Sequence, residues 1–369
     1  AWAMSQLDGA HRWQTLAIEL APKIDTAPRD IARLALDYGE IGFLLGGPSQ
    51  QVVVAQRALE AMLALPEPEA EDRETSARLR GMLGGALFHE GDVEGSRAML
   101  REGLAQLGSP DGSAVRAYLN SVLGWTYWRA GPVEEAIPIL EAAVAEAEAV
   151  GDSHTLRWAN HDLGVALGML GDHDAAVARA EESMRLAQEA DDRNLVMRCY
   201  INLPAIRANR GDDSRPLLEM ALEGIGHARR AAAGGLVCWL AGNIAGVPTE
   251  MGRLDEALEY ADEAVTAAAA HVPGNYAMTL SDRASLHRLR GEPEAAQRDE
   301  ELLDELGVEP EPQVKAHRFF SVAQQRWLTD PAGSLAGLVE HLEQAAAGAD
   351  ERAKIAHWVA RGALRMNDR

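Results

Sequence analysis

Residues 122–136 read VLGWTYWRAGPVEEA, and residues 162–176, forty positions later, read DLGVALGMLGDHDAA. Both stretches contain a Leu-Gly pair, a second glycine seven positions after that pair, and an alanine five positions further on. The first copy carries two tryptophans, Trp125 and Trp128, where the second has smaller residues. The shared positions predict a repeated packing unit, and the tryptophans predict a function that is specific to the first copy.

The second glycine of this pattern recurs along the whole chain. It stands at Gly47, Gly91, Gly131, Gly171, Gly211, Gly252 and Gly291, with Asp330-Pro331 in the last equivalent place. Positions seven before and five after it are mostly small, as at Gly84, Gly124 and Ala136. Glycine supplies the positive φ that ends a helix, and small residues let two helices approach closely. Each period of about forty residues therefore predicts a helical hairpin.

The residues around these glycines predict local details of the hairpins. Asp92, Asp172 and Asp212 follow three of the glycines and are suited to cap the next helix. Leu83, Leu123, Leu163 and Leu203, eight positions before a glycine, should form the packed seam. Prolines at 204, 216 and 248 predict that the array bends, breaks a helix or changes its stacking between the fifth and sixth hairpins.

The segments LGWTYWRAG and LGVALGMLGD, each with an alanine five positions after its last glycine, resemble tetratricopeptide repeats in a long form. The resemblance covers nearly the whole chain, and it implies an all-α, right-handed superhelical solenoid of about eight to nine hairpins with a concave groove. Residues 1–369 would form one solenoid, with a partial hairpin in 1–30, core repeats in 31–330, and a last repeat and cap in 331–369.

The long repeats and the opening GAHRWQTLAIELAP also resemble the C-terminal arms of bacterial multidomain signalling ATPases and transcriptional regulators. In those proteins the arm is a sensor or a platform for protein binding. This resemblance implies a regulatory role for the chain, with any ATPase lying outside it.

Composition excludes several classes of function. A formal charge of −22 opposes the binding of nucleic acid, which needs Lys and Arg against its phosphates. No apolar run approaches the length of a membrane span, and only Cys199 and Cys238 occur, so we expect a cytoplasmic protein with two inert thiols. The sequence lacks HExxH, paired CxxC, GxSxG and a phosphate loop. We therefore expect no enzyme, no catalytic residue, no metal site and no cofactor.

Aromatic and arginine residues gather thirteen, ten, six and three positions before the recurring glycines, a spacing that shares one helix face. In tetratricopeptide arrays this face lines the groove, where Phe88 and His89 would also lie. We predict one ligand site there, made of Tyr118, Trp125, Trp128, Arg129, Trp158, His161, Arg198, Asn202 and Trp239. Arg198 and Asn202, one turn apart, could hold a carboxylate. The alternative is that the tryptophans only fill the interior between helices.

These observations leave two functions open. The first is a binding module, the sensor or interaction arm of a bacterial regulator, whose groove takes a peptide, a protein segment or a small effector. The second is a structural scaffold or adaptor that joins partners or copies of itself, so that a homo-oligomer is possible. The residues at the predicted site favour the first, because aromatic and arginine side chains anchor recognition surfaces.

Overall fold

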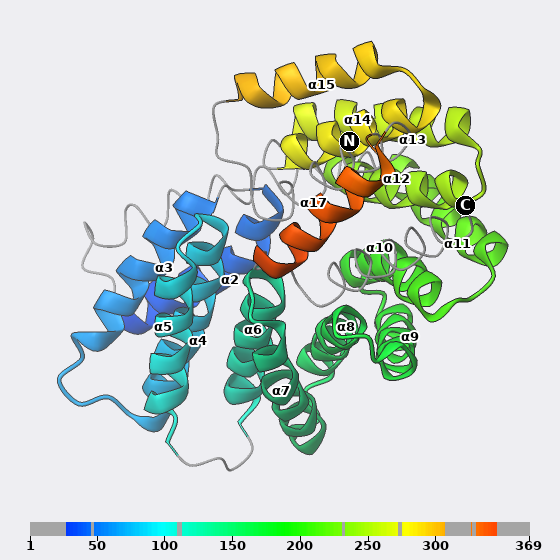
Figure 1. Cartoon of the computed structure of the whole chain (residues 1–369). Coiled ribbons are helices and arrows are strands. Elements are labelled where there is room, and N and C mark those ends of the chain that lie inside the picture. The colour runs from blue at the N-terminus through cyan, green and yellow to red at the C-terminus, as the bar shows by residue number, and fades with distance from the viewer. Residues whose placement is uncertain are drawn as a thin grey trace. The chain divides into compact units, whose positions relative to one another are not determined.

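A computed structural model of the chain describes residues 27–45, 48–108, 113–230, 233–271, 275–306, 326 and 330–344. Fifteen α-helices and no strand lie in this described part, which confirms the all-α solenoid of hairpins (Figure 1). The chain divides into two compact units, Ala1–Ala166 and Leu167–Arg369. The recurring Gly47, the hairpin predicted in 1–30 and most of the cap predicted in 331–369 lie outside the described residues.

The N-terminal unit is built from three complete hairpins and most of a further helix. Its elements are α2 (Pro28–Leu45), α3 (Pro48–Leu63), α4 (Ala70–His89), α5 (Val93–Gln106), α6 (Ala114–Ala130), the 3-10 turn η2 (Val133–Glu135), α7 (Ala136–Val150) and α8 (Ser153–Met169), which contains the boundary between the units. In each hairpin the first helix packs on the second, and the first helices α2, α4 and α6 pack on one another in order (Figure 1). This is the stacking that a solenoid requires.

The C-terminal unit repeats the arrangement. Its helices after α8 are α9 (His173–Glu189), α10 (Arg193–Arg210), α11 (Ser214–Arg230), α12 (Gly234–Glu250), α13 (Leu254–His271), α14 (Tyr276–Arg290), α15 (Pro293–Glu305) and α17 (Pro331–Gln344). Here α10, α12 and α14 are first helices, each packed on the helix that follows it; α10 also packs on α12, and α12 on α14. The second helices include α9, α11, α13 and α15.

The recurring glycines adopt the conformation that the sequence predicts. Within the described residues, Gly91, Gly131, Gly171, Gly211, Gly252 and Gly291 all have positive φ, between 61° and 97°. No side chain is favoured in that region of φ, so glycine closes each first helix without strain. The predicted turns are confirmed at all six positions.

Two of the three predicted aspartate caps are confirmed, and the third is wrong. Asp92 and Asp172 each accept a hydrogen bond from the backbone N–H three residues later. Asp212 instead pairs with Arg210, at 2.6 and 2.7 Å, and Asp213 accepts from the backbone N–H of Arg215. The cause is one extra residue in this repeat, which moves the start of α11 along the chain.

Of the three effects predicted for the prolines, a helix break is wrong at Pro204, because α10 continues through it to Arg210; a bend or a change of stacking stays a prediction. A proline removes one helical hydrogen bond and leaves carbonyls of the preceding turn weakly bonded. Asn243 of α12 donates from Nδ2 to the carbonyl oxygen of Ile201 in this turn, at 2.8 Å. A side chain of the next first helix thus supports the backbone beside the proline.

The other two prolines also leave their helices unbroken. Pro216 is the third residue of α11, where a backbone N–H has no helical partner to lose. Pro248 lies in the last turn of α12, and Thr249 donates its hydroxyl to the carbonyl oxygen of Ala245, at 2.6 Å. Position in the first turn explains why Pro216 costs less than an interior proline, whereas Pro248 still removes the hydrogen bond that its position would donate to the carbonyl oxygen of Ile244.

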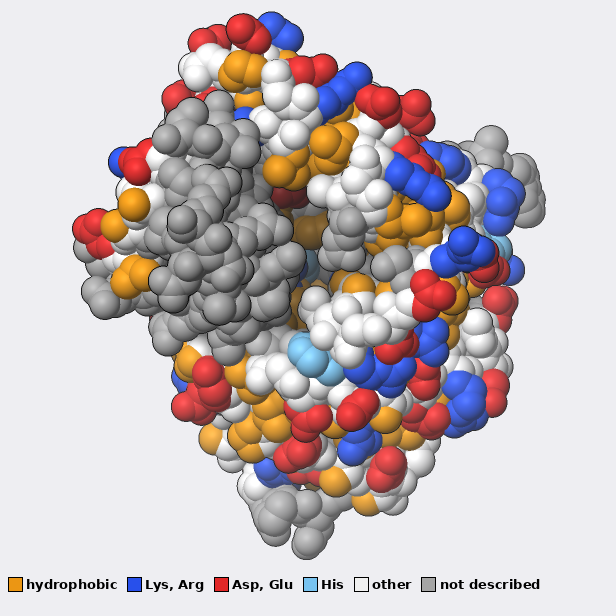
Figure 2. Space-filling view, turned by 45° about the vertical axis from the view of Figure 1, so that its right-hand side comes forward, with side chains coloured by type: hydrophobic (Ala, Val, Ile, Leu, Met, Phe, Trp, Pro, Cys, Tyr) orange, Lys and Arg blue, Asp and Glu red, His pale blue; other side chains and the backbone are white. Residues whose placement is uncertain are grey.

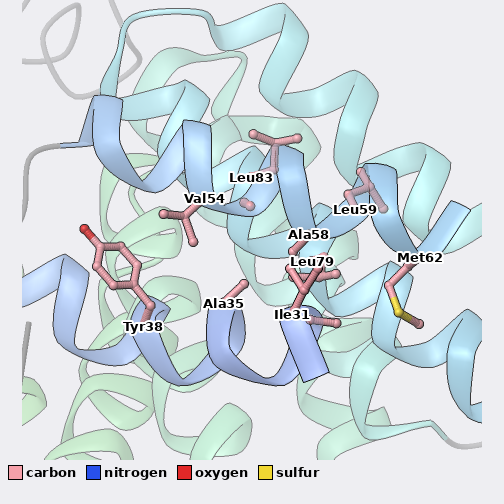
Figure 3. Packing of buried hydrophobic residues seen from close by; sticks show 11 residues of the cluster. Ile31, Ala35, Tyr38, Val54, Ala58, Leu59, Met62, Leu79 and Leu83 are labelled. Atoms are coloured by element: carbon pink, nitrogen blue, oxygen red, sulfur yellow. The ribbon is translucent and has the colours of Figure 1, made fainter. Parts of the chain in front are cut away.

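The hydrophobic core follows the predicted seam. Leu83, Leu123, Leu163 and Leu203 are at most 5% exposed, which confirms that eight positions before the glycine is a core position. In the first hairpins, side chains from α2, α3 and α4 meet in one cluster that includes Ile31, Tyr38 and Met62 (Figure 3).

A buried arginine fixes the C-terminal end of α6. Arg97 of α5 is 6% exposed, and its Nη2 donates to the carbonyl oxygens of Thr126 and Gly131, at 3.1 and 2.6 Å. Its guanidinium also lies over the ring of Tyr127, with Cζ 4.1 Å from the centroid. These contacts satisfy the last carbonyls of α6, so the turn that carries Trp125 and Trp128 is held in place.

The small residues of the first helices allow the hairpins to close. An added Cβ on Gly84 would lie 2.8 Å from Cγ of Leu100, and one on Gly124 would lie 2.4 Å from Cγ of Leu140. Both leucines belong to second helices and are fully buried. A larger residue at either glycine would push the two helices apart.

Gly84 and Gly85 provide a matched pair that tests this contact. Gly84→Ala is expected to lower the free energy of unfolding by about 1 to 3 kcal/mol, because the methyl group overpacks the interface. Gly85→Ala, whose Cβ would meet nothing within 4 Å, should raise it by about 0.5 to 1 kcal/mol through helix propensity. Urea denaturation of both variants makes the measurement. Equal effects of the same sign would contradict the role assigned to Gly84.

Candidate functional site

The strongest gathering of aromatic side chains joins the C-terminal ends of α4 and α6. Trp125 is half-buried, and its ring centroid lies 4.5 Å from that of Phe88 and 5.3 Å from that of His89. The planes of the Trp125 and Phe88 rings are tilted by 54°. The sequence placed all three on one face, and the structure brings them into contact.

Trp128 and Arg129 extend this cluster by one turn. Arg129 is exposed, and its Cζ lies 5.5 Å from the centroid of the Trp128 ring, within the range of a cation–π contact. The Nε1 atom of Trp128 is buried and has no hydrogen-bond acceptor among the described residues. An indole N–H without an acceptor is unusual in a structural role, because it costs the desolvation of that group.

Tyr118 lies on α6 toward its other end, against α4. An added Cβ on Gly81 would lie 2.4 Å from Cε1 of Tyr118, so the phenol ring covers the backbone of α4 at this glycine. Burial raises the pKa of the Tyr118 hydroxyl, and the charge of Arg78 on α4 partly opposes that rise. Arg78 itself is exposed. Tyr118 and Arg78 are therefore neighbours on the side of α4 and α6 where the predicted site begins.

The two predicted site residues on α8, Trp158 and His161, differ in burial. Trp158 is half-buried, and its ring centroid lies 6.4 Å from that of His161. His161 is 2% exposed, and its Nδ1 lies 2.9 Å from Oδ1 of Asp162, which is itself buried. The expectation that His161 faces the groove is thus wrong, because the position ten before the glycine is buried in this repeat. His161 supports Trp158 from behind.

The remaining predicted residues belong to the C-terminal unit. Arg198 and Asn202 lie one turn apart on α10, and Trp239 lies on α12; all three are half-buried. Cys199 and Cys238, beside them in sequence, are buried as expected, and burial raises the pKa of the Cys238 thiol. A single site made of all nine predicted residues stays a prediction, since the two units are described separately.

The described residues offer neither a metal site nor a membrane span. No cluster of three His, Cys, Asp or Glu side chains close enough to hold a metal ion occurs among them. Within the same part of the chain, no helix combines the length and the apolar character needed to cross a membrane. The aromatic cluster of α4 and α6 is therefore the feature from which a function is best argued.

The fold is that of a tetratricopeptide solenoid. Residues 113–189, which cover α6 to α9, match the family model described as "Tetratricopeptide repeat". No curated protein matches the sequence. The finer resemblance, to the arms of multidomain signalling ATPases, stays a prediction.

Solved structures with the same fold include bacterial regulators. A Rap protein complexed with competence and sporulation factor is similar over 92% of this chain and 99% of its own, with a TM-score of 0.64 and 11% identity. The apo form of the quorum sensor NprR from B. thuringiensis covers 90% of this chain and 93% of its own, with a TM-score of 0.62 and 15% identity. NprR in complex with its cognate peptide NprX gives a TM-score of 0.59 at 14% identity, over 89% of this chain and 97% of its own.

The depth of His161 generates a test of its role. His161→Ala is expected to lower the free energy of unfolding by about 2 to 3 kcal/mol, because it leaves the buried carboxylate of Asp162 without this partner. Arg129→Ala, at an exposed position, should change it by no more than about 1 kcal/mol. Urea denaturation monitored by circular dichroism compares them. A His161 variant as stable as the parent would show that this histidine is not part of the core.

Proposed function

We propose that this chain is a binding module of a regulatory protein and that it takes a peptide or a protein segment along its first helices. The observation that carries the proposal is the contact of Trp125 with Phe88 and His89, continued by Trp128 and Arg129. Aromatic and arginine side chains dominate the energy of recognition surfaces, since they combine large contact area with directed polar groups. These residues are not needed to close the hairpins, which the leucines and small residues do.

The nature of the ligand is supported by the fold. A Rap protein and NprR, which share the architecture, have been solved with competence and sporulation factor and with a cognate peptide respectively. An extended segment is a suitable ligand for stacked first helices, because successive helices present side chains at regular intervals along one surface. We infer a sensing or interaction role for the chain, with no chemistry of its own.

A random heptapeptide library, displayed on phage and selected on the full chain, supplies ligands for a direct test. A selected peptide should bind the Trp125→Ala/Trp128→Ala double variant more weakly by about 2 kcal/mol or more, roughly thirtyfold in Kd. Fluorescence anisotropy of the labelled peptide gives both constants. Circular dichroism of the variant should match the parent, because both tryptophans lie outside the repeat seam.

Leu302→Ala is the matched control for loss of apolar surface. Leu302 is exposed on the second helix α15, so its removal should leave the affinity within about twofold. If the double variant unfolds, the tryptophans belong to the core. Full affinity in a folded double variant would show that the peptide binds elsewhere on the array. That outcome would favour a scaffold that joins partners through its outer faces.

A further inference from the structure

Residues 75–89 of α4 and the whole of α6 differ in charge from the second helix α7 and from the start of α4, which carries Glu71, Asp72 and Glu74. Residues 75–89 of α4 and the whole of α6 contain arginines, including Arg78 and Arg129, and no aspartate or glutamate. Residues 133–150, which form η2 and α7, contain five glutamates and no arginine or lysine. In a chain with a formal charge of −22, stretches without a carboxylate on two neighbouring first helices stand apart from the average.

Acidic and basic side chains are intermixed over the face of the molecule that Figure 2 shows. On the second helix α9, the exposed Arg185 pairs with Glu182 and Glu189, both at 2.6 Å. A neutralised group of this kind creates little field of its own.

The arginines of α4 and α6 divide between the two sides of these helices. Arg80 donates to Gln106 of α5 at 2.5 Å, and Arg116 donates to the carbonyl oxygen of Gly108. Both are thus engaged toward second helices and connecting turns. The charge of Arg78 acts instead on the hydroxyl of Tyr118, and Arg129 lies over Trp128. One basic side chain therefore accompanies the aromatic residues at each end of α6.

These residues define what we call the α4/α6 strip: Arg78, Tyr118, Phe88, Trp125, Trp128 and Arg129. From Tyr118 to Arg129 the strip follows about 16 Å of α6, given a rise of about 1.5 Å per residue. An extended peptide advances about 3.3 Å per residue, so the strip matches about five residues. Apolar contact is offered in the middle and positive charge at both ends.

We propose that the α4/α6 strip selects acidic peptide segments, in which an aromatic or large aliphatic side chain is flanked by carboxylates. The inference rests on the proposed function and adds the chemistry of the ligand. An apolar side chain would lie against Trp125 and Phe88, and a carboxylate would meet Arg129, whose guanidinium is already oriented by the Trp128 ring. Charge-assisted hydrogen bonds from arginine to carboxylate are among the stronger polar contacts.

The overall negative charge does not prevent this selection. At physiological ionic strength the Debye length is about 8 Å, so charges beyond that distance are largely screened. The exposed glutamates of α7 lie on a second helix, and one helix is about 10 Å across. A ligand on the strip therefore responds to Arg78 and Arg129 more than to the acidic exterior.

The test uses the same random heptapeptide library on the full-length parent and on Arg129→Glu, with Arg57→Glu as the control. Arg57 is exposed on the second helix α3, so its substitution makes the same change in net charge away from the strip. The parent and Arg57→Glu should both enrich peptides that contain Asp or Glu beside an aromatic or large aliphatic residue. Arg129→Glu should lose the acidic residues and enrich Lys or Arg.

Affinities measured by fluorescence anisotropy make the comparison quantitative. An acidic peptide selected on the parent should bind Arg129→Glu about tenfold or more weakly, Arg129→Gln by an intermediate factor, and Arg57→Glu within about twofold. Because Arg129 is exposed, both of its variants are expected to fold, which circular dichroism checks.

The outcomes separate this inference from the function on which it rests. Enrichment of neutral or basic peptides on the parent would leave peptide binding intact and overturn the preference for acidic segments. Unchanged affinity of the acidic peptide for Arg129→Glu would overturn the assignment to the strip. No enrichment of any peptide on the parent would overturn the proposed function, and the inference with it.

Discussion

The close contact between a glycine of the first helix and a leucine of the second is the constraint on which the hairpins α4–α5 and α6–α7 depend. Gly84 faces Leu100 and Gly124 faces Leu140, at distances that no side chain could occupy. Hydrophobic burial of these leucines stabilises the pair, and the missing Cβ sets how near the helices come. In each of these hairpins, one face of the first helix packs on the second helix. The other faces of the first helix can contact the neighbouring hairpin or a ligand.

The direction of the Trp125 side chain follows from this helix packing. Trp125 is the residue after Gly124, so the period of 3.6 residues turns its side chain about 100° away from the hairpin contact. Thr126 and Tyr127, which come next, are buried, and Arg97 holds the carbonyls at the end of this helix. A firmly held backbone is a suitable base for recognition, because less conformational entropy is lost when a ligand orders the side chains.

The carboxylates that give the chain its large negative charge are distributed unevenly among the helices. Carboxylates lie mainly on second helices, where water solvates them and arginines pair with many of them, as Arg283 of α14 does with Asp262 of α13. In the N-terminal unit, residues 75–89 of α4 and the whole of α6 carry arginine and aromatic side chains and no carboxylate. The same protein is thus acidic in total and has a local surface of opposite character, which short-range contact can use and long-range attraction cannot.

The sequence by itself determined the hairpins, because their signals are local. Positive φ at Gly91 or Gly171 depends only on the residue and its turn, and the seam at Leu123 and Leu163 depends on helical period. Only the tertiary structure decided which positions of the first helices remain exposed to solvent. His161 and Ser121, both ten positions before a glycine, are buried, and at the equivalent Gly81 the ring of Tyr118 from the next first helix covers the backbone. The backbone beside Pro204 is likewise supported by Asn243 from an adjacent hairpin, 42 residues after Ile201, whose carbonyl oxygen it bonds. Contacts between hairpins have no local signature, since the partners are set by stacking and not by the spacing within one repeat.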